Sequence, residues 1–306
     1  MSDLAPLVVI LGPTASGKSA LGIKLAEQLS GEILVCDSTQ VYRHFDIGTA
    51  KVPVAEQRGI PHHLVDLVEP REVFTAGEYR RRALEILAGL RERGKLPILT
   101  AGTGLYLRAL LEGLSDAPER SEELRERLRK KVELRGPAHL HRILKRMDRE
   151  AAARIAPQDT QKIIRAIEIR TLAKKPVSDV HRAGRIALEG YAVTKIGLMP
   201  PRAALYARID ARVEAMLRAG WVEEVRKLID QGTPADAKPF QFIGYSQLRA
   251  SIESAQSIEV AREQVQQATR QFAKRQITWF RKEPDVHWLT GFGDDPDVLT
   301  ASFAFL

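Results

Sequence analysis

The stretch from residue 11 to residue 22, LGPTASGKSALG, constrains the fold of this chain most strongly. It contains the pattern G-x-x-x-x-G-K-[ST], with a β-branched apolar run, LVVIL (7–11), before it and a helical pattern, residues 18–29, after it. A glycine-rich turn between a buried strand and a helix is typical of α/β proteins that bind a phosphate group at that turn. The stretch therefore predicts a phosphate-binding loop in an α/β fold.

Strands and helices alternate through the first hundred residues. EILVCD (32–37) and LPILT (96–100) have the composition of buried strands, and Thr75 with Glu78 has the spacing of a helix capping box. Strands that alternate with helices favour a parallel sheet whose two faces are both covered. We therefore predict a P-loop-type α/β fold with a mostly parallel sheet flanked by helices.

From about Pro118 the pattern changes to charged amphipathic helices without a strand-like run. These helices are expected at residues 120–133, 137–147 and 159–173. A strand pattern returns with YAVTKIGLMP (191–200). The sequence thus predicts an all-helical insertion, residues 118–185, in a catalytic core formed by residues 1–117 and 186–306.

After Pro201 the whole chain has a helical pattern, including a long segment at 261–282. Arg270, Lys274 and Arg281 lie on roughly one face of that segment. Both RNA contact and packing on the core are open interpretations of this face.

The positive charge of the chain is concentrated in the predicted insertion. The formal net charge is +8, and residues 118–185 hold 19 Lys and Arg against 10 Asp and Glu. Such a local excess is expected of a segment that binds a polyanion, although a charge run is also typical of a solvated helix face. No apolar run is long enough to span a membrane, and a cytoplasmic enzyme is expected.

The glycine loop, defined here as residues 12–19, has the groups that a phosphate site needs. Its glycines let the backbone N–H groups of residues 14–19 turn around an anion, and the N-terminus of the next helix adds a favourable dipole. Lys18 supplies a positive charge, and Ser19 is a candidate Mg²⁺ ligand. The predicted phosphate-binding residues are Gly12, Pro13, Thr14, Ala15, Ser16, Gly17, Lys18 and Ser19.

Asp37 closes the second strand, in VCDSTQVY (35–42). Three interpretations of this carboxylate are open: a turn or cap residue, a Mg²⁺ ligand as in P-loop NTPases, or a general base facing the glycine loop. TAGTG (100–104) follows another strand and brings the Thr103 hydroxyl to the same edge of the sheet.

Seven sequence blocks between residues 12 and 281 share one order with a known family. They are GPTASGKS (12–19), DSTQVYRHFDIGTAK (37–51), GIPHHLVD (59–66), AGTGLYLRALLEGL (101–114), DTQKIIRAIEI (159–169), IGYSQ (243–247) and ATRQFAKRQITWFR (268–281). With these blocks the chain resembles the bacterial tRNA dimethylallyltransferases, also called tRNA isopentenyltransferases. It has DST where DSM is usual and AGTG where GGTG is usual, so Ala101 tests whether the backbone there needs a glycine.

The resemblance implies transfer of a dimethylallyl group from dimethylallyl diphosphate to N6 of adenosine 37, beside the anticodon of a tRNA, with Mg²⁺ as cofactor. It assigns Asp37 as the base that takes the N6 proton and Thr103 as the contact to the bridging oxygen. Lys18 and an arginine would stabilise the departing diphosphate. Arg208 and Arg212 are one helical turn apart, and we favour Arg208 for this role.

The resemblance also implies that the enzyme binds the tRNA anticodon stem-loop with the target base flipped out. The predicted tRNA-contacting residues are Asp37, Ser38, Thr39, Gln40, Thr103, Gln161, Lys162, Ile163, Ile164 and Arg165. The last five lie in the basic insertion, which is expected to bind tRNA mainly through phosphates. We expect a monomer that does not associate with a membrane.

Three other functions remain open from the sequence. A small-molecule kinase would use the glycine loop, Mg²⁺ and Asp37 with ATP as donor, but would leave the basic insertion unexplained. Prenyl transfer to a free adenine nucleotide would need no cationic insertion, and an RNA-binding protein with a relict phosphate loop would need no base. Whether ATP also binds the glycine loop is likewise open.

Overall fold

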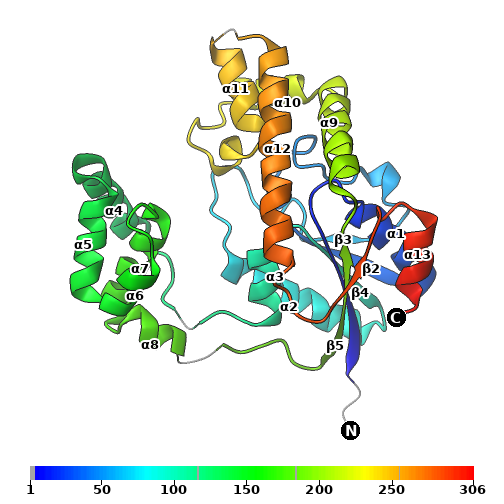
Figure 1. Ribbon diagram of the computed structural model, residues 1–306, viewed down its shortest axis with the longest axis horizontal. Helices are drawn as coiled ribbons and strands as arrows, with labels where there is room; N and C mark the ends of the chain where they lie inside the picture. Colours follow the sequence, from blue (N-terminus) through cyan, green and yellow to red (C-terminus); the bar gives the residue numbers. More distant parts are fainter. Residues whose placement is uncertain (1–3, 116, 183–184, 255) are drawn as a thin grey trace. The chain divides into compact units, whose positions relative to one another are not determined.

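The computed structural model divides into two compact units (Figure 1). The core unit is formed by Met1–Leu110 and Glu189–Leu306, and the helical unit by Leu111–Leu188. The residues that the structure describes are 4–115, 117–182, 185–254 and 256–306.

The helical unit extends beyond the insertion expected at 118–185 because its two connecting segments pair with each other. An antiparallel bridge joins Ser115 to Arg185, and the Leu188 N–H donates to the Leu111 carbonyl at 2.9 Å. Backbone pairing of this kind leaves no apolar pattern in the sequence, so the boundaries that it sets were not visible there.

The core unit contains a six-stranded sheet in the order β3-β2-β4-β1-β5-β6, in which each neighbouring pair is parallel. The strands are β1 Ala5–Leu11, β2 Gly31–Cys36, β3 His62–His63, β4 Leu96–Ala101, β5 Tyr191–Leu198 and β6 Val286–Leu289. The predicted parallel α/β fold is confirmed. Because all strands point the same way, the loops after β1, β2, β4 and β5 emerge at one edge of the sheet.

Helices cover both faces of this sheet: α1 and α13 lie on one side and α2 and α3 on the other (Figure 1). The helices that begin in the core unit are α1 Lys18–Leu29, α2 Ala76–Glu92, α3 Gly104–Leu111, α9 Arg202–Arg218, α10 Trp221–Asp230, α11 Tyr245–Ser254, α12 Ile258–Phe280 and α13 Pro296–Phe303. Half of the predicted capping box is present: the Thr75 side chain accepts a hydrogen bond from the Glu78 N–H ahead of α2, whereas the Glu78 carboxylate pairs with Arg81 and Arg82. No helix in the described ranges is long and apolar enough to cross a membrane.

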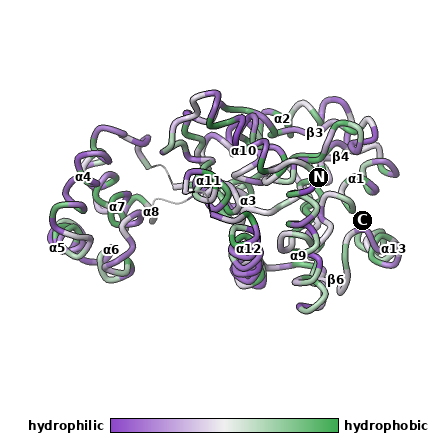
Figure 2. The backbone as a smooth tube through the Cα atoms, turned by 90° about the horizontal axis from the view of Figure 1, so that it is seen from above, coloured by the Kyte–Doolittle hydropathy of each residue, from purple (hydrophilic) through white to green (hydrophobic). Residues whose placement is uncertain are grey.

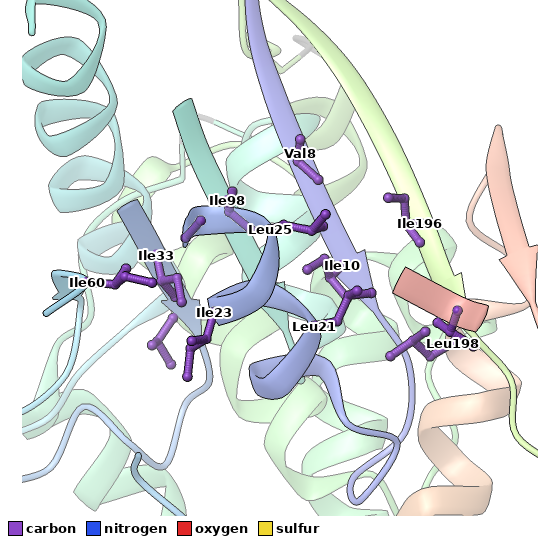
Figure 3. Packing of buried hydrophobic residues seen from close by; sticks show 13 residues of the cluster. Val8, Ile10, Leu21, Ile23, Leu25, Ile33, Ile60, Ile98, Ile196 and Leu198 are labelled. Atoms are coloured by element: carbon purple, nitrogen blue, oxygen red, sulfur yellow. The ribbon is translucent and has the colours of Figure 1, made fainter. Parts of the chain in front are cut away.

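The side chains of β1 alternate between the two faces of the sheet, and both sets are buried. Val8 and Ile10 pack with Leu21 of α1 in one apolar cluster (Figure 3). The intervening Leu7 and Val9 point to the opposite face and are fully buried as well. A strand covered on both faces is apolar throughout, as LVVIL is.

The prediction that the chain is helical throughout after Pro201 is wrong. β6 adds a parallel strand beside β5, with Lys195 opposite Val286 and Leu198 opposite Leu289. The run VHWL gave no strand signal because it is four residues long and its two central residues are exposed. β3, with two residues, was missed for the same reason.

The helical unit has an apolar core of its own, which contains Leu128 of α4, Leu140 and Leu144 of α5, and Ile163 of α7. Its helices are α4 Glu122–Arg135, α5 Pro137–Met147, α6 Arg149–Arg154, α7 Thr160–Ala173 and α8 Val177–Arg182. Hydrophobic and hydrophilic residues alternate along them (Figure 2). The three longer helices were predicted, whereas α6 and α8 were not, since six residues hold too few turns to show a helical period.

Candidate active site

The glycine loop connects β1 to α1 at the carboxyl edge of the sheet. Ala15 and Gly17 have left-handed backbone conformations, with φ of 62° and 89°. Left-handed residues in a turn direct successive N–H groups toward one point, which is an arrangement that binds anions. The Lys18 ammonium lies against this loop and donates to the carbonyls of Gly12 and Pro13 at 2.9 and 2.8 Å.

The charge of Lys18 is poorly compensated. Burial lowers the pKa of its ammonium to about 8, while the nearby Asp37 carboxylate opposes this and the Arg212 guanidinium adds to it. A buried cation is stabilised when an anion binds beside it. The surroundings of Lys18 therefore favour a negatively charged ligand at the glycine loop.

Two of the backbone N–H groups expected to bind the phosphate are already used. The Thr14 N–H donates to Oε1 of Gln276 at 2.7 Å, and the Ser16 N–H donates to the Pro13 carbonyl at 3.3 Å. The donor set of residues 14–19 stays a prediction, in which these two groups would have to exchange their present partners for a phosphate. The Ser16 hydroxyl is buried, and no described residue forms a hydrogen bond with it.

The two oxygens of Asp37 have different environments. Oδ1 accepts from the Thr39 N–H and hydroxyl at 2.8 and 2.7 Å, so this oxygen makes the turn contact. Among the described residues none donates to Oδ2, which lies 2.8 Å from where a Cβ on residue 102 would stand. Gly102 is therefore required by the close approach of the carboxylate. Oδ1 therefore stabilises the turn, and Oδ2 is free to accept a hydrogen bond or a proton from a ligand.

The Thr103 loop, residues 102–104, lies beside this carboxylate. The Thr103 hydroxyl accepts from the Ser38 N–H at 3.0 Å and is 3.3 Å from the Ser38 hydroxyl. The Thr103 N–H donates to the Cys36 carbonyl at 3.0 Å, which ties the ends of β4 and β2 together. Ala101 has no positive φ, so the alanine in place of the usual glycine needs no special backbone conformation.

Arg208 and Arg212 have different surroundings on α9. Arg208 pairs with Asp294 at 2.7 Å and stacks over the Phe292 ring at 4.6 Å from its centroid. Arg212 has no hydrogen bond or ion pair within the described ranges. Burial lowers its pKa, Arg208 lowers it further, and Asp37 opposes them. Arg208 stays the prediction from the sequence, and the geometry offers Arg212 as a second, unpaired cation near Asp37.

The turn after Asp37 carries three of the predicted RNA-contacting residues, Ser38, Thr39 and Gln40, and all are partly exposed. Gln40 donates from Nε2 to a backbone carbonyl at 3.0 Å, so its side chain braces the turn. The structure thus brings the predicted residues of the glycine loop, this turn and the Thr103 loop to one edge of the sheet.

The five predicted RNA-contacting residues on α7 differ in exposure. Gln161 and Lys162 are exposed, and Arg165 is half-buried with an ion pair inside the helical unit. Ile163 and Ile164 are 0% and 2% exposed in the core of that unit. The RNA contacts of all five residues stay predictions, and the helical period turns the side chains of Ile163 and Ile164 inward.

Two residues at the site were missed in the sequence, Gln276 and Asp294. An amide inside a helix and a carboxylate near a turn belong to no short motif, and their partners are 262 and 86 residues away. Gln276 lies within a family-like block, which was the one available signal.

Comparisons with known proteins agree with this geometry. The model of the family described as IPP transferase matches residues 40–283. A tRNA dimethylallyltransferase of Solibacter usitatus is 50% identical over 293 residues, which cover 96% of this chain and 95% of the relative.

Solved structures agree as well. The tRNA isopentenylpyrophosphate transferase of Bacillus halodurans is 36% identical, with a TM-score of 0.72 and coverage of 98% of this chain and 95% of that one. A eukaryotic dimethylallyltransferase acting on tRNA is 27% identical, with a TM-score of 0.82 and coverage of 98% and 77%. The blocks, the parallel sheet and the arrangement of its loops thus have one common explanation: the chain belongs to the IPP transferase family.

Proposed function

We propose that this protein transfers the dimethylallyl group of dimethylallyl diphosphate to N6 of adenosine 37 in tRNA and releases diphosphate. The observation that carries the proposal is that a loop suited to bind an anion lies near a carboxylate oxygen without a hydrogen-bond donor. Lys18 and Arg212 are partly buried cations whose pKa values respond to Asp37, and Oδ2 of Asp37 has no described donor. The names of the relatives supply the reaction, and the chain's own residues supply the chemistry.

The glycine loop would hold the leaving group. As the bond between the allylic carbon and the bridging oxygen breaks, negative charge develops on the diphosphate and positive charge on the allyl group. Lys18, Arg208 with Arg212 as a second cation, and the remaining loop N–H groups would stabilise the diphosphate, with Thr103 as the proposed contact to its bridging oxygen. Removing one such donor typically costs about 10²–10³-fold in rate.

Asp37 would act as the general base. The N6 amine of adenine is a weak nucleophile, and it loses a proton as its nitrogen bonds to the allylic carbon. Oδ2 of Asp37 would accept that proton, while Oδ1 keeps its hydrogen bonds to Thr39. A positioned base typically contributes about 10²–10⁴-fold.

The donors at this edge suit Mg²⁺. Ser19 stands in the first turn of α1, where its hydroxyl can serve as one oxygen ligand. In the described part of the chain no cluster of three His, Cys, Asp or Glu forms a metal cage, and Mg²⁺ is commonly held by few protein oxygens together with substrate phosphates. Bound there, it would neutralise charge on the diphosphate.

The helical unit would bind the RNA backbone. Burial, and then the positive charges of Arg135, Arg142, Lys131 and Arg146, lower the pKa of His139. These four side chains are exposed, and none forms an ion pair with a described residue. Unpaired cations clustered at the end of α4 and along α5 are suited to phosphates.

The test is product analysis. The protein is incubated with tRNA, dimethylallyl diphosphate and Mg²⁺, and the tRNA is digested to nucleosides for mass spectrometry. N6-dimethylallyladenosine is expected at the base beside the anticodon. Equally efficient prenylation of AMP would contradict the RNA substrate, and thermal stabilisation by ATP but not by dimethylallyl diphosphate would favour a kinase.

A further inference from the structure

One side chain from α12 spans the two loops of the active site. Oε1 of Gln276 accepts from the Thr14 N–H at 2.7 Å, and its Nε2 donates to the Gly102 carbonyl at 2.8 Å. The residue is 6% exposed. The glycine loop and the Thr103 loop are thus joined through a single buried amide that belongs to neither.

Glutamine is suited to this bridge because its two ends must differ. The Thr14 N–H is only a donor and the Gly102 carbonyl only an acceptor, so the bridging group must accept at one end and donate at the other. A carboxylate lacks the donor, an apolar side chain lacks both, and asparagine is one methylene shorter. The buried backbone groups would lose their partners in each case, at a cost in free energy.

The helix that carries Gln276 is itself anchored at the site. Trp279, one turn further along α12, packs its indole against Gly104 on the other side of Thr103. One turn before Gln276, on the same face of α12, Ala273 packs with Ala15 of the glycine loop and with Ile209 of α9. Contacts one turn before and one turn after Gln276 give α12 a fixed position from which Gln276 sets the spacing of the loops.

We propose that Gln276 is a positioning residue: it holds the glycine loop, and so the departing diphosphate, in register with the Thr103 loop and Asp37. The inference rests on the proposed transfer reaction. Gln276 acts through the backbone of the two loops and not on the substrate. Its loss therefore lowers turnover more than binding, because a misplacement of about 1 Å between reacting groups can cost 10²-fold in rate.

The test compares three variants of the full chain. Gln276→Leu keeps the side-chain volume and removes both hydrogen bonds, and about a 10²-fold fall in kcat is expected, with the Kd of the anticodon stem-loop within about threefold of the wild type. Gln266→Leu is the matched control, since Gln266 lies on the same helix and donates to a backbone carbonyl of α9 at 3.3 Å. This control should keep kcat.

Gln276→Glu gives a signature that a merely structural role would not produce. When protonated, a glutamic acid both donates and accepts, so it restores the bridge; when ionised, it cannot donate to Gly102. Burial beside Asp37 should raise the pKa of the introduced carboxyl. The kcat of this variant relative to the wild type should therefore rise as the pH falls.

Several outcomes would overturn the inference. Gln276→Leu with a kcat like that of the control would do so, and, if that variant does not fold, a flat pH ratio for Gln276→Glu would decide against it. If the wild-type protein transfers no dimethylallyl group, the proposed function is wrong, but the inference about Gln276 is still testable by hydrogen exchange. An unchanged exchange rate of the Thr14 N–H in Gln276→Leu would show that the Gln276 side chain does not hold the glycine loop.

Discussion

At the scale of the residue, the chemistry of the site depends on which atoms of Asp37, Thr103 and the glycine loop stay available after their neighbours have packed. Their spacing in the sequence, each after a strand and in a short motif, predicted that they reach one edge of the sheet, but it did not identify their partners. That Arg208 pairs with Asp294, or that Thr14 N–H is taken by Gln276, depends on residues brought together by the fold. The sequence pattern predicts which residues reach the edge of the sheet. Tertiary packing determines which of their atoms stay available to bind a ligand.

The unequal oxygens of Asp37 lead to the first prediction. Asp37→Asn keeps an oxygen for the Thr39 contacts and removes the base, so the transfer rate should fall about 10²–10⁴-fold. The Kd for the anticodon stem-loop should change by less than about threefold, since the proton moves only in the transition state. Single-turnover kinetics and RNA titration measure the two quantities, and a near wild-type rate would show that another group takes the proton.

The pKa of Lys18 gives a second prediction. With its pKa lowered to about 8, Lys18 is charged in the free enzyme below that pH and loses its proton as the pH rises above it. Affinity for an unreactive thio-analogue of dimethylallyl diphosphate should therefore fall above about pH 8, with proton uptake on binding. Calorimetry in buffers of different ionisation enthalpy measures both. Lys18→Met should bind weakly with a flat profile, and an identical slope in this variant would refute the assignment.

At the scale of the element, periodicity placed the long helices and the buried strands, because repeated apolar positions carry the signal. Periodicity did not predict β3, β6, α6 and α8, because each of these elements is too short for its apolar pattern to repeat. The same periodicity argues against RNA contacts by Ile163 and Ile164, since it places both in the core of the helical unit. Family resemblance marked the α7 segment, and only packing separated its exposed residues from its buried ones.

The buried carboxylate of α7 provides a prediction at this scale. Burial would raise the pKa of Glu168, but hydrogen bonds from Arg125 and Arg165 lower it to about 2. Glu168→Gln leaves Arg125 without its counter-charge and should cost about 3 kcal/mol of unfolding free energy near neutral pH. The wild-type contribution is present above the ordinary glutamate pKa and is lost as the pH falls toward 2, so the difference between the proteins should shrink in acid.

Glu150→Gln is the control for this measurement. Its ion pair with Arg154 is exposed on one helical face, so its loss should change stability by less than about 0.5 kcal/mol. Urea unfolding followed by circular dichroism compares the two variants. Equal destabilisation of both would contradict a special role for the buried pair.

At the scale of the whole molecule, composition located the positive charge before the structure showed where it is unpaired. The insertion holds many cations, yet Arg125, Arg129 and Arg165 are committed to carboxylates within it. The number of these charges can be read from the sequence, but the carboxylates with which they form ion pairs cannot. The exposed group around His139 belongs to the cations that form no ion pair with a described residue, and it is suited to a polyanion.

Salt dependence tests this surface. The double change Arg142→Gln with Arg146→Gln should weaken tRNA binding and reduce the slope of log Kd against log salt by about 2. Arg154→Gln, which removes an exposed and ion-paired cation of the same unit, should leave the slope unchanged. Filter binding across a salt series measures it, and equal slopes in all three proteins would place the RNA elsewhere.

The segment after residue 283 lies outside the residues that the family model matches, yet it contacts the glycine loop and α1. The Gly293 N–H donates to the Ser16 carbonyl at 2.9 Å, and Lys24 of α1 donates to the Asp294 carbonyl at 2.9 Å. These two hydrogen bonds support the glycine loop and α1 from the segment that follows β6. Substitutions in this stretch should change turnover by shifting the glycine loop, although they alter none of the residues that the family model matches.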